Sequence, residues 1–147
     1  MELTMGERIR FVRQFRGLTQ IELAEKLGLP PGENGRIRIS QYENGTHVPK
    51  EDMLEKISEA LGVTSLYLSN KPHTSMLDFV FHLLEYDRDI PIQIEKNGEN
   101  DYALHFSNEI MFDFLDEWIQ KKADLKEGKI SKEEYIEWTI NLGPNNI

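Results

Sequence analysis

Residues 36–45, RIRISQYENG, decide the fold of this chain. Read as a helix, the stretch has two unlike faces, because at 3.6 residues per turn Ile39 and Tyr42 fall on the same side. The outward side carries the mostly polar set Arg36, Ile37, Ser40 and Gln41. Asn44-Gly45 then ends the helix, since glycine accepts the left-handed backbone conformation that follows many helices. The stretch therefore predicts a helix over about 35–44 that docks through one apolar side.

The outward face of this predicted helix has the chemistry of a DNA-recognition helix. Arginine and glutamine can make paired hydrogen bonds to the edges of guanine and adenine in the major groove. An ordinary amphipathic surface helix also points polar groups outward. The flanking sequence must decide between these two interpretations.

Composition and charge limit the class of protein. The chain has 147 residues, no cysteine and a net charge of −9, so it has neither a disulfide framework nor a thiolate zinc site. No apolar run approaches a membrane span, and the N-terminus lacks the apolar segment of a signal peptide, which favours a cytoplasmic protein. The charge is uneven: residues 8–38 hold 7 basic and 3 acidic side chains, whereas residues 71–147 hold 8 and 16. Positive charge therefore surrounds the candidate recognition helix.

Helix-start signals precede and follow that helix. Thr4 with Glu7, and Thr19 with Glu22, have the spacing of capping boxes. The helix after Thr19 is expected to bury its apolar side chains, which are Ile21, Leu23, Ala24 and Leu27. A Pro- and Gly-rich turn follows over 29–35, with Asn34 as the expected N-cap of the next helix. Further helices are predicted over 50–61 and 64–68.

These elements together resemble a known family. GLTQIELAEKLG (17–28), ISQYENG (39–45) and KISEALGV (56–63) are similar to the Cro and phage-repressor, or XRE-type, helix-turn-helix domains. The resemblance covers residues 4–70 and implies a five-helix bundle. It also implies a sequence-specific transcriptional regulator that binds double-stranded DNA.

The resemblance assigns expected roles residue by residue. It implies an ion pair between Arg13 and Glu43 that joins the first helix to the third. The expected DNA-binding residues are Thr19, Gln20, Arg36, Ile37, Arg38, Ser40, Gln41 and Asn44. Two departures from the family pattern are visible. The 29–35 turn is longer than usual. Relatives often place Lys or Arg against phosphate in the stretch where this chain has Thr46, His47, Val48 and Glu51, so a dimer is expected to be needed for tight binding.

Residues 71–147 predict a second, α+β domain in the order α-β-β-α-α. Apolar residues at helical spacing predict a helix over about 75–85, and alternation over 90–95 and 102–106 predicts an amphipathic hairpin. Asn97-Gly98 suggests a two-residue turn, but pairing Ile94 with Tyr102 through a three-residue loop keeps the apolar side chains on one face. A long helix should begin at Ser107 or Asn108, and a last one should follow a capping box formed by Ser131 and Glu134.

The long helix carries more apolar surface than its own domain obviously needs. Its two columns are Ile110, Phe114 and Trp118, and Met111, Leu115 and Ile119. They fit either an intradomain core or a homodimer face, and we expect dimerisation or a regulatory role to reside in residues 71–147. The acidic second half also leaves open a protein-interaction module, such as an antitoxin or anti-repressor.

Other chemistries find little support in the sequence. The four histidines lie far apart, and no nucleophile motif or phosphate-binding loop occurs, so no enzyme activity, metal or cofactor is expected. The segment ending at Glu134 resembles half of a calcium-binding loop, but Ala123 and Leu125 stand where ligands would be required.

Overall fold

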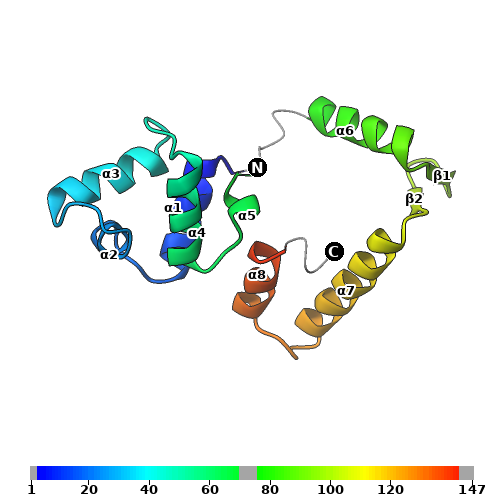
Figure 1. The fold of residues 1–147 in the computed structure, drawn as a ribbon. Helices are drawn as coiled ribbons and strands as arrows, with labels where there is room; N and C mark the ends of the chain where they lie inside the picture. Colours follow the sequence, from blue (N-terminus) through cyan, green and yellow to red (C-terminus); the bar gives the residue numbers. More distant parts are fainter. Residues whose placement is uncertain (1–2, 70–75, 143–147) are drawn as a thin grey trace. The chain divides into compact units, whose positions relative to one another are not determined.

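The computed structural model describes residues 3–69 and 76–142, which form two compact units divided between Pro72 and His73 (Figure 1). The first unit contains the helices α1 (Met5–Phe15), α2 (Gln20–Lys26), α3 (Glu33–Glu43), α4 (Glu51–Leu61) and α5 (Ser65–Ser69). The second contains α6 (Met76–Asp89), β1 (Ile92–Lys96), β2 (Tyr102–Phe106), α7 (Glu109–Lys126) and α8 (Lys132–Ile140). The predicted fold class, mainly helical with one small antiparallel sheet, is confirmed.

Local sequence signals account for most helix starts in the first unit. Thr4 and Thr19 accept hydrogen bonds from the backbone N–H groups of Glu7 and Glu22, whose carboxylates accept in return from the N-cap backbone. These reciprocal bonds satisfy amides that a helix start leaves without partners. Both predicted capping boxes are therefore present, as is the third, at Ser131 in the second unit.

The first unit has a closed apolar core. Its fully buried side chains come from all five helices, and they are Ile9, Val12, Leu23, Ile39, Ile57, Leu61 and Leu68. Ile39 is the α3 contribution, as the two-faced pattern of 36–45 predicts. Ile21 was expected on the buried side of α2 but is 37% exposed, because at 100° per residue it lies at the edge of the face that Leu23 and Ala24 bury. The core thus fixes α3 by one side only.

The start of α3 differs from the prediction. The helix begins at Glu33, two residues before the expected position, and its N-cap is Gly32 rather than Asn34. Gly32 has φ +69° and ψ −136°, a backbone conformation that favours glycine, so the turn can end early only at this residue. Gly35 then lies on the inner side of α3, where an added Cβ would stand 2.8 Å from the Cβ of Ala24. The absence of a side chain at Gly35 lets α3 approach α2.

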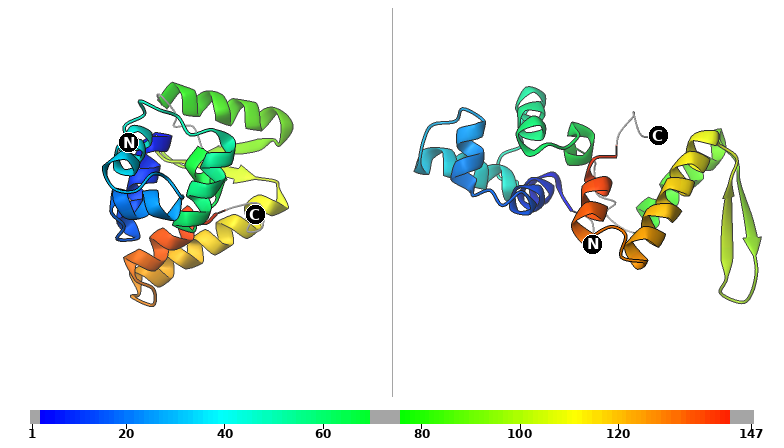
Figure 2. Two further views of the ribbon diagram at one scale, coloured as in Figure 1. Left: turned by 60° about the vertical axis from the view of Figure 1, so that its left-hand side comes forward. Right: turned by 90° about the horizontal axis from the view of Figure 1, so that it is seen from below.

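The hairpin of the second unit has the predicted faces but another register. Ile94 pairs with Leu104 and Ile92 with Phe106, so the expected Ile94–Tyr102 pairing is wrong by two residues. A shift of two preserves which side chains share a face. The backbone N–H of Asn97 donates to the carbonyl of Asp101 at 2.8 Å, and residues 97–101 form a longer connection than either predicted turn. The right-hand view of Figure 2 shows the hairpin as two antiparallel strands that extend away from α6 and α7.

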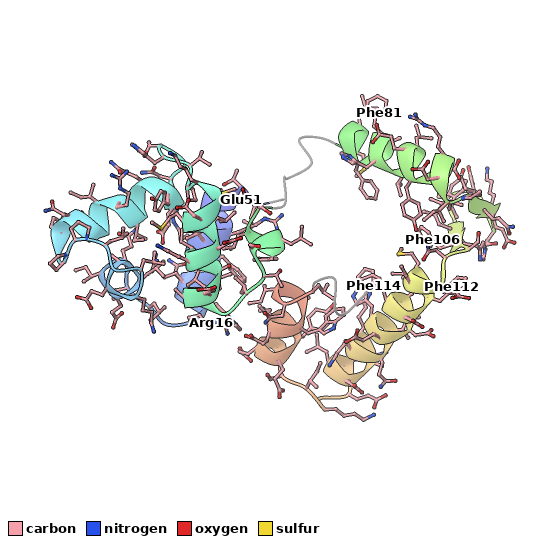
Figure 3. All side chains as sticks on the ribbon, in the orientation of Figure 1. Arg16, Glu51, Phe81, Phe106, Phe112 and Phe114 are labelled. Carbon is pink, nitrogen blue, oxygen red and sulfur yellow. The ribbon has the colours of Figure 1, made fainter. Side chains whose placement is uncertain are left out.

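The second unit leaves most of its apolar surface uncovered. No residue of α7 is buried, and large apolar side chains with at least 38% exposure lie on α6, the hairpin and α7: Met76, Leu77, Phe79, Val80, Phe81, Leu84, Ile94, Tyr102, Leu104, Ile110, Phe112, Trp118 and Ile119. Figure 3 shows Phe112 and Phe114 leaving different sides of α7, and Phe81 on the outer side of α6. A groove of about 480 Å³, lined by side chains such as Phe79, Phe106 and Trp118, opens between these elements.

Candidate nucleic-acid interface

A buried carboxylate fixes the inner side of α3. The side chain of Glu43 is 0% exposed, and its Oε1 and Oε2 accept from Nε and Nη2 of Arg13 on α1, the second bond measuring 3.0 Å. Arg13 is also buried, and its Nη1 donates to the carbonyl of Leu18 at 2.7 Å. Gln20 on α2 and Arg10 on α1 donate to Oε2 as well. Glu43 therefore joins three helices, and its paired, hydrogen-bonded charge sets the rotation of α3 about its own axis.

With that rotation fixed, a distinct set of α3 side chains points outward. The core-facing residues are Gly35, Ile39, Tyr42 and Glu43. At 100° per residue, the opposite arc holds Ile37, Ser40, Gln41 and Asn44, and Arg36 lies on its flank, next to Glu43. Ile37 is 43% exposed and Arg38 is also exposed, on the flank of this arc. The structure thus brings six of the eight predicted DNA-binding residues onto α3 and its C-cap, Asn44, with their side chains at least partly accessible.

The other two predicted residues begin α2, next to α3. The Thr19 hydroxyl is used in its capping box. Gln20 has two partners: its Nε2 donates to Glu43 Oε2 at 2.8 Å, and its Oε1 accepts from Nη1 of Arg36 at 3.4 Å. Gln20 therefore links the inner carboxylate of α3 to an outward side chain of the same helix.

The end of α3 has its own hydrogen-bonded turn. Asn44 Oδ1 accepts from the backbone N–H and the hydroxyl of Thr46, at 3.0 and 2.7 Å. The Asn44 Nδ2 group keeps its donors, since no partner for it occurs within residues 3–69 or 76–142. His47 and Val48 are exposed beyond this turn. The surface after α3 therefore carries amide and imidazole groups and little positive charge.

One residue of this surface escaped the sequence analysis. Glu33, the first residue of α3, forms an ion pair with Arg36, whose Nε donates to Glu33 Oε2 at 2.8 Å and whose Nη2 donates to Oε1. The hydrogen bond from Arg36 lowers the pKa of Glu33, and the same bond raises the pKa of Arg36. The spacing i,i+3 could have revealed the pair, but residue 33 was assigned to the turn.

Two other kinds of site were sought in the described parts of the chain. Within residues 3–69 and 76–142, no three acidic or histidine side chains gather as metal ligands do. Across the same ranges, the helices are too short or too polar to cross a membrane.

Comparison with known proteins agrees with this geometry. A family described as a helix-turn-helix domain matches residues 6–73. The N-terminal domain of this chain belongs to the XRE-type helix-turn-helix family. The HTH-type transcriptional regulator ImmR of Bacillus subtilis (strain 168) is 36% identical over 73 residues, which span 50% of this chain and 54% of ImmR. The chain thus matches only about half the length of that relative.

Two further relatives extend the comparison of this helix-turn-helix protein. The immunity repressor protein of Bacillus phage phi105 is 29% identical over 112 residues, 74% of each chain. A match of that length necessarily extends into the second unit. The P22 c2 repressor, solved in complex with a synthetic operator, is 30% identical and covers 48% of this chain and 100% of its own, with a TM-score of 0.42.

Proposed function

We propose that this chain is a sequence-specific DNA-binding transcriptional regulator that inserts α3 into the major groove. The orientation of α3 is the observation that supports the proposal most directly. Glu43 and Ile39 hold one side of the helix to the core, and the accessible side presents Arg36 and Gln41. These two residue types are suited to guanine and adenine edges, and the methyl groups of Ile37 suit the thymine methyl.

The roles within the interface follow from reach and chemistry. Arg36, Ile37 and Gln41 are the proposed base readers. Arg38, Ser40 and Asn44 flank them on α3 and supply donors to the phosphate backbone, as does the start of α2 at Thr19 and Gln20. The few cations on this surface limit the electrostatic part of the affinity, so a single domain should bind modestly.

The second unit is proposed to supply a dimer. The second unit, His73–Ile147, has no buried residue on α7, and a unit of this size draws little stability from so small a core. The exposed apolar side chains of α6, the hairpin and α7 exceed what an isolated domain normally leaves in water. Pairing two copies through these residues would join two helix-turn-helix domains. Their half-sites would be separated by about one helical turn, roughly 34 Å.

Binding to a random pool of duplexes, followed by selection and sequencing, tests the proposal with the full chain. An enriched pseudo-palindrome is expected. Replacing Arg36 or Gln41 by Ala should then weaken the selected site by about 1–3 kcal/mol and relax the preference at one base pair. Arg88→Ala is the matched control, because it removes an exposed charge from α6. Uniform weakening of all duplexes by Arg36→Ala would make Arg36 a phosphate contact instead.

The salt dependence separates the proposal from a protein-interaction module. DNA affinity should fall steeply as salt rises, since phosphate contacts release counterions. Failure to enrich any duplex, together with a salt-insensitive protein partner, would favour the interaction module.

Sedimentation tests the dimer. The full chain is expected to sediment as a dimer, and Ile110→Asp with Ile119→Asp should shift it to the monomer, because both side chains are more than half exposed. Leu66→Asp, at an equally exposed apolar position in α5, serves as the control. A wild-type monomer at micromolar concentration would refute the dimer.

A further inference from the structure

The ion pair between Glu33 and Arg36 has an unusual position for a surface salt bridge. It lies in the first turn of α3, on the side of the helix that carries the proposed base readers, and both side chains are accessible, at 64% and 41% exposure. A surface pair of this kind adds little to stability. An acidic side chain beside DNA phosphates also opposes binding. The effect of Glu33 on the binding of DNA must therefore come from its contact with Arg36.

The guanidinium of Arg36 is held from two directions. Glu33 accepts from Nε and Nη2 in a bidentate contact. From the other direction, the Oε1 of Gln20 accepts from Nη1 at 3.4 Å. The side-chain amide of Gln20 cannot rotate by 180° without losing a hydrogen bond. Its Nε2 donates to the buried carboxylate of Glu43, and a rotated amide would place an oxygen there instead of a donor. Arg36 is thus oriented by one residue of its own helix and by one residue fixed to the core.

Counting donors shows what this arrangement leaves free. A guanidinium has five N–H groups in a planar fork. Glu33 uses two of them and Gln20 uses one. One N–H remains on Nη1 and one on Nη2. Two donors on adjacent nitrogens are what the O6 and N7 acceptors of guanine require.

The charge of Glu33 also favours a contact of Arg36 with guanine over a contact with phosphate. The pKa of Glu33 is lowered, mainly by the hydrogen bond from Arg36, so the carboxylate stays ionised at neutral pH. Arg36 therefore presents a local charge that is already balanced. A phosphate gains little from approaching such a pair and is repelled by the carboxylate, whereas a guanine edge needs donors rather than net charge.

We propose that Glu33 is a specificity-determining residue, which with Gln20 orients Arg36 toward guanine and suppresses its contact with phosphate. This inference rests on the proposed function, because it assumes that α3 reads DNA. It predicts that the carboxylate weakens non-specific binding more than it affects the selected site.

Equilibrium binding of the full chain to two fluorescent duplexes tests the inference. One duplex carries the selected site and the other a scrambled sequence of equal length. Glu33→Gln keeps the shape of the side chain but removes its charge. Glu33→Gln should tighten binding to the scrambled duplex and narrow the ratio of the two dissociation constants about tenfold, within the range of one bidentate base contact. Glu25→Gln removes the same charge from an exposed position on α2 and should leave the ratio unchanged.

The Arg36→Ala background separates orientation from general repulsion. If Glu33 acts through Arg36, adding Glu33→Gln to Arg36→Ala changes the ratio no further. A Glu33→Gln effect no larger than that of Glu25→Gln, or one that persists in the Arg36→Ala background, overturns the inference.

An NMR titration of the Glu33 carboxyl distinguishes a failure of this inference from a failure of the proposed DNA-binding function. Arg36→Ala should raise the pKa of Glu33 toward its ordinary value, whether or not DNA is bound, and an unchanged pKa would remove the ion pair on which the inference stands. Wild-type protein that binds both duplexes equally would instead refute the proposed function, and this inference with it. Selective binding that survives Glu33→Gln refutes this inference alone.

Discussion

Breaking the buried pair Arg13–Glu43 should strongly destabilise the first unit. Replacing Glu43 by Ala leaves the buried guanidinium of Arg13 with one acceptor, the Leu18 carbonyl, in place of a bidentate partner. Removing one member of a buried pair costs about 3–5 kcal/mol, since the remaining charge is desolvated without compensation. Arg13→Ala should lie near the lower end, about 3 kcal/mol, because Glu43 keeps its bonds from Gln20 and Arg10.

The positions of the tryptophans make this measurement specific. Both tryptophans, Trp118 and Trp138, lie in the second unit. Urea unfolding followed by tryptophan fluorescence therefore reports that unit, while far-UV circular dichroism also reports the helices of the first. Glu43→Ala should lower the midpoint of the first unit's transition and leave the tryptophan transition in place. Glu25→Ala, which removes a carboxylate from an exposed position, is the matched control.

A double-mutant cycle gives the decisive result. The double variant Arg13→Ala with Glu43→Ala removes both charges together, so it should cost less than the sum of the two single changes. Single-variant losses below about 1 kcal/mol, typical of exposed ion pairs, would refute the reasoning. So would additive losses, because the two side chains would then not be coupled.

Three further outcomes test other parts of the structure. Gly35→Ala should destabilise the first unit by about 1–3 kcal/mol, as overpacking does, because the new Cβ meets the Cβ of Ala24 at 2.8 Å; chemical denaturation measures the loss. Hydrogen bonds from Thr19 lower the pKa of Glu22 below 4.5, so its contribution to stability is complete above pH 4.5 and is lost as pH falls through the lowered value; Glu22→Gln should flatten the acid limb of the stability–pH profile. Asn108→Ala should cost about 1 kcal/mol, because Asn108 Oδ1 caps α7 through the N–H groups of Ile110 and Met111, and tryptophan-detected unfolding checks it.

The sequence predicts the first unit well because its signals are local. Capping boxes at Thr4 and Thr19 mark helix starts within a few residues, and the period of Ile39 and Tyr42 defines the buried face. The prediction was wrong where a choice depended on backbone conformation. Asn34 is the better N-cap by side chain, but Gly32 ends the turn because it adopts φ +69°.

The register of the hairpin and the contacts of the interface could not be predicted from local sequence patterns. Alternation identifies the apolar face of the hairpin but permits any register shifted by two, and the bond from Asn97 to Asp101 selects among them. The candidate DNA-binding positions could be taken from the resemblance, and their roles stay predictions. The contacts of Gln20 depend on two elements approaching each other, and no spacing in the sequence reveals them.

The hydrogen bonds of Gln20 have a consequence for any attempt to redirect this protein to another operator. A new side chain at position 36 would inherit surroundings arranged for a guanidinium: an amide oxygen on one side and a carboxylate on the other. A glutamine at position 36 would find no hydrogen-bond donor for its own carbonyl oxygen, because both neighbouring groups are acceptors. Positions 33 and 36 should therefore be randomised together in a library. Position 20 should vary with them only among side chains that can donate to Glu43, which is kept. Libraries that vary α3 alone would sample mostly mismatched neighbours, and their yield of altered specificities should be correspondingly poor.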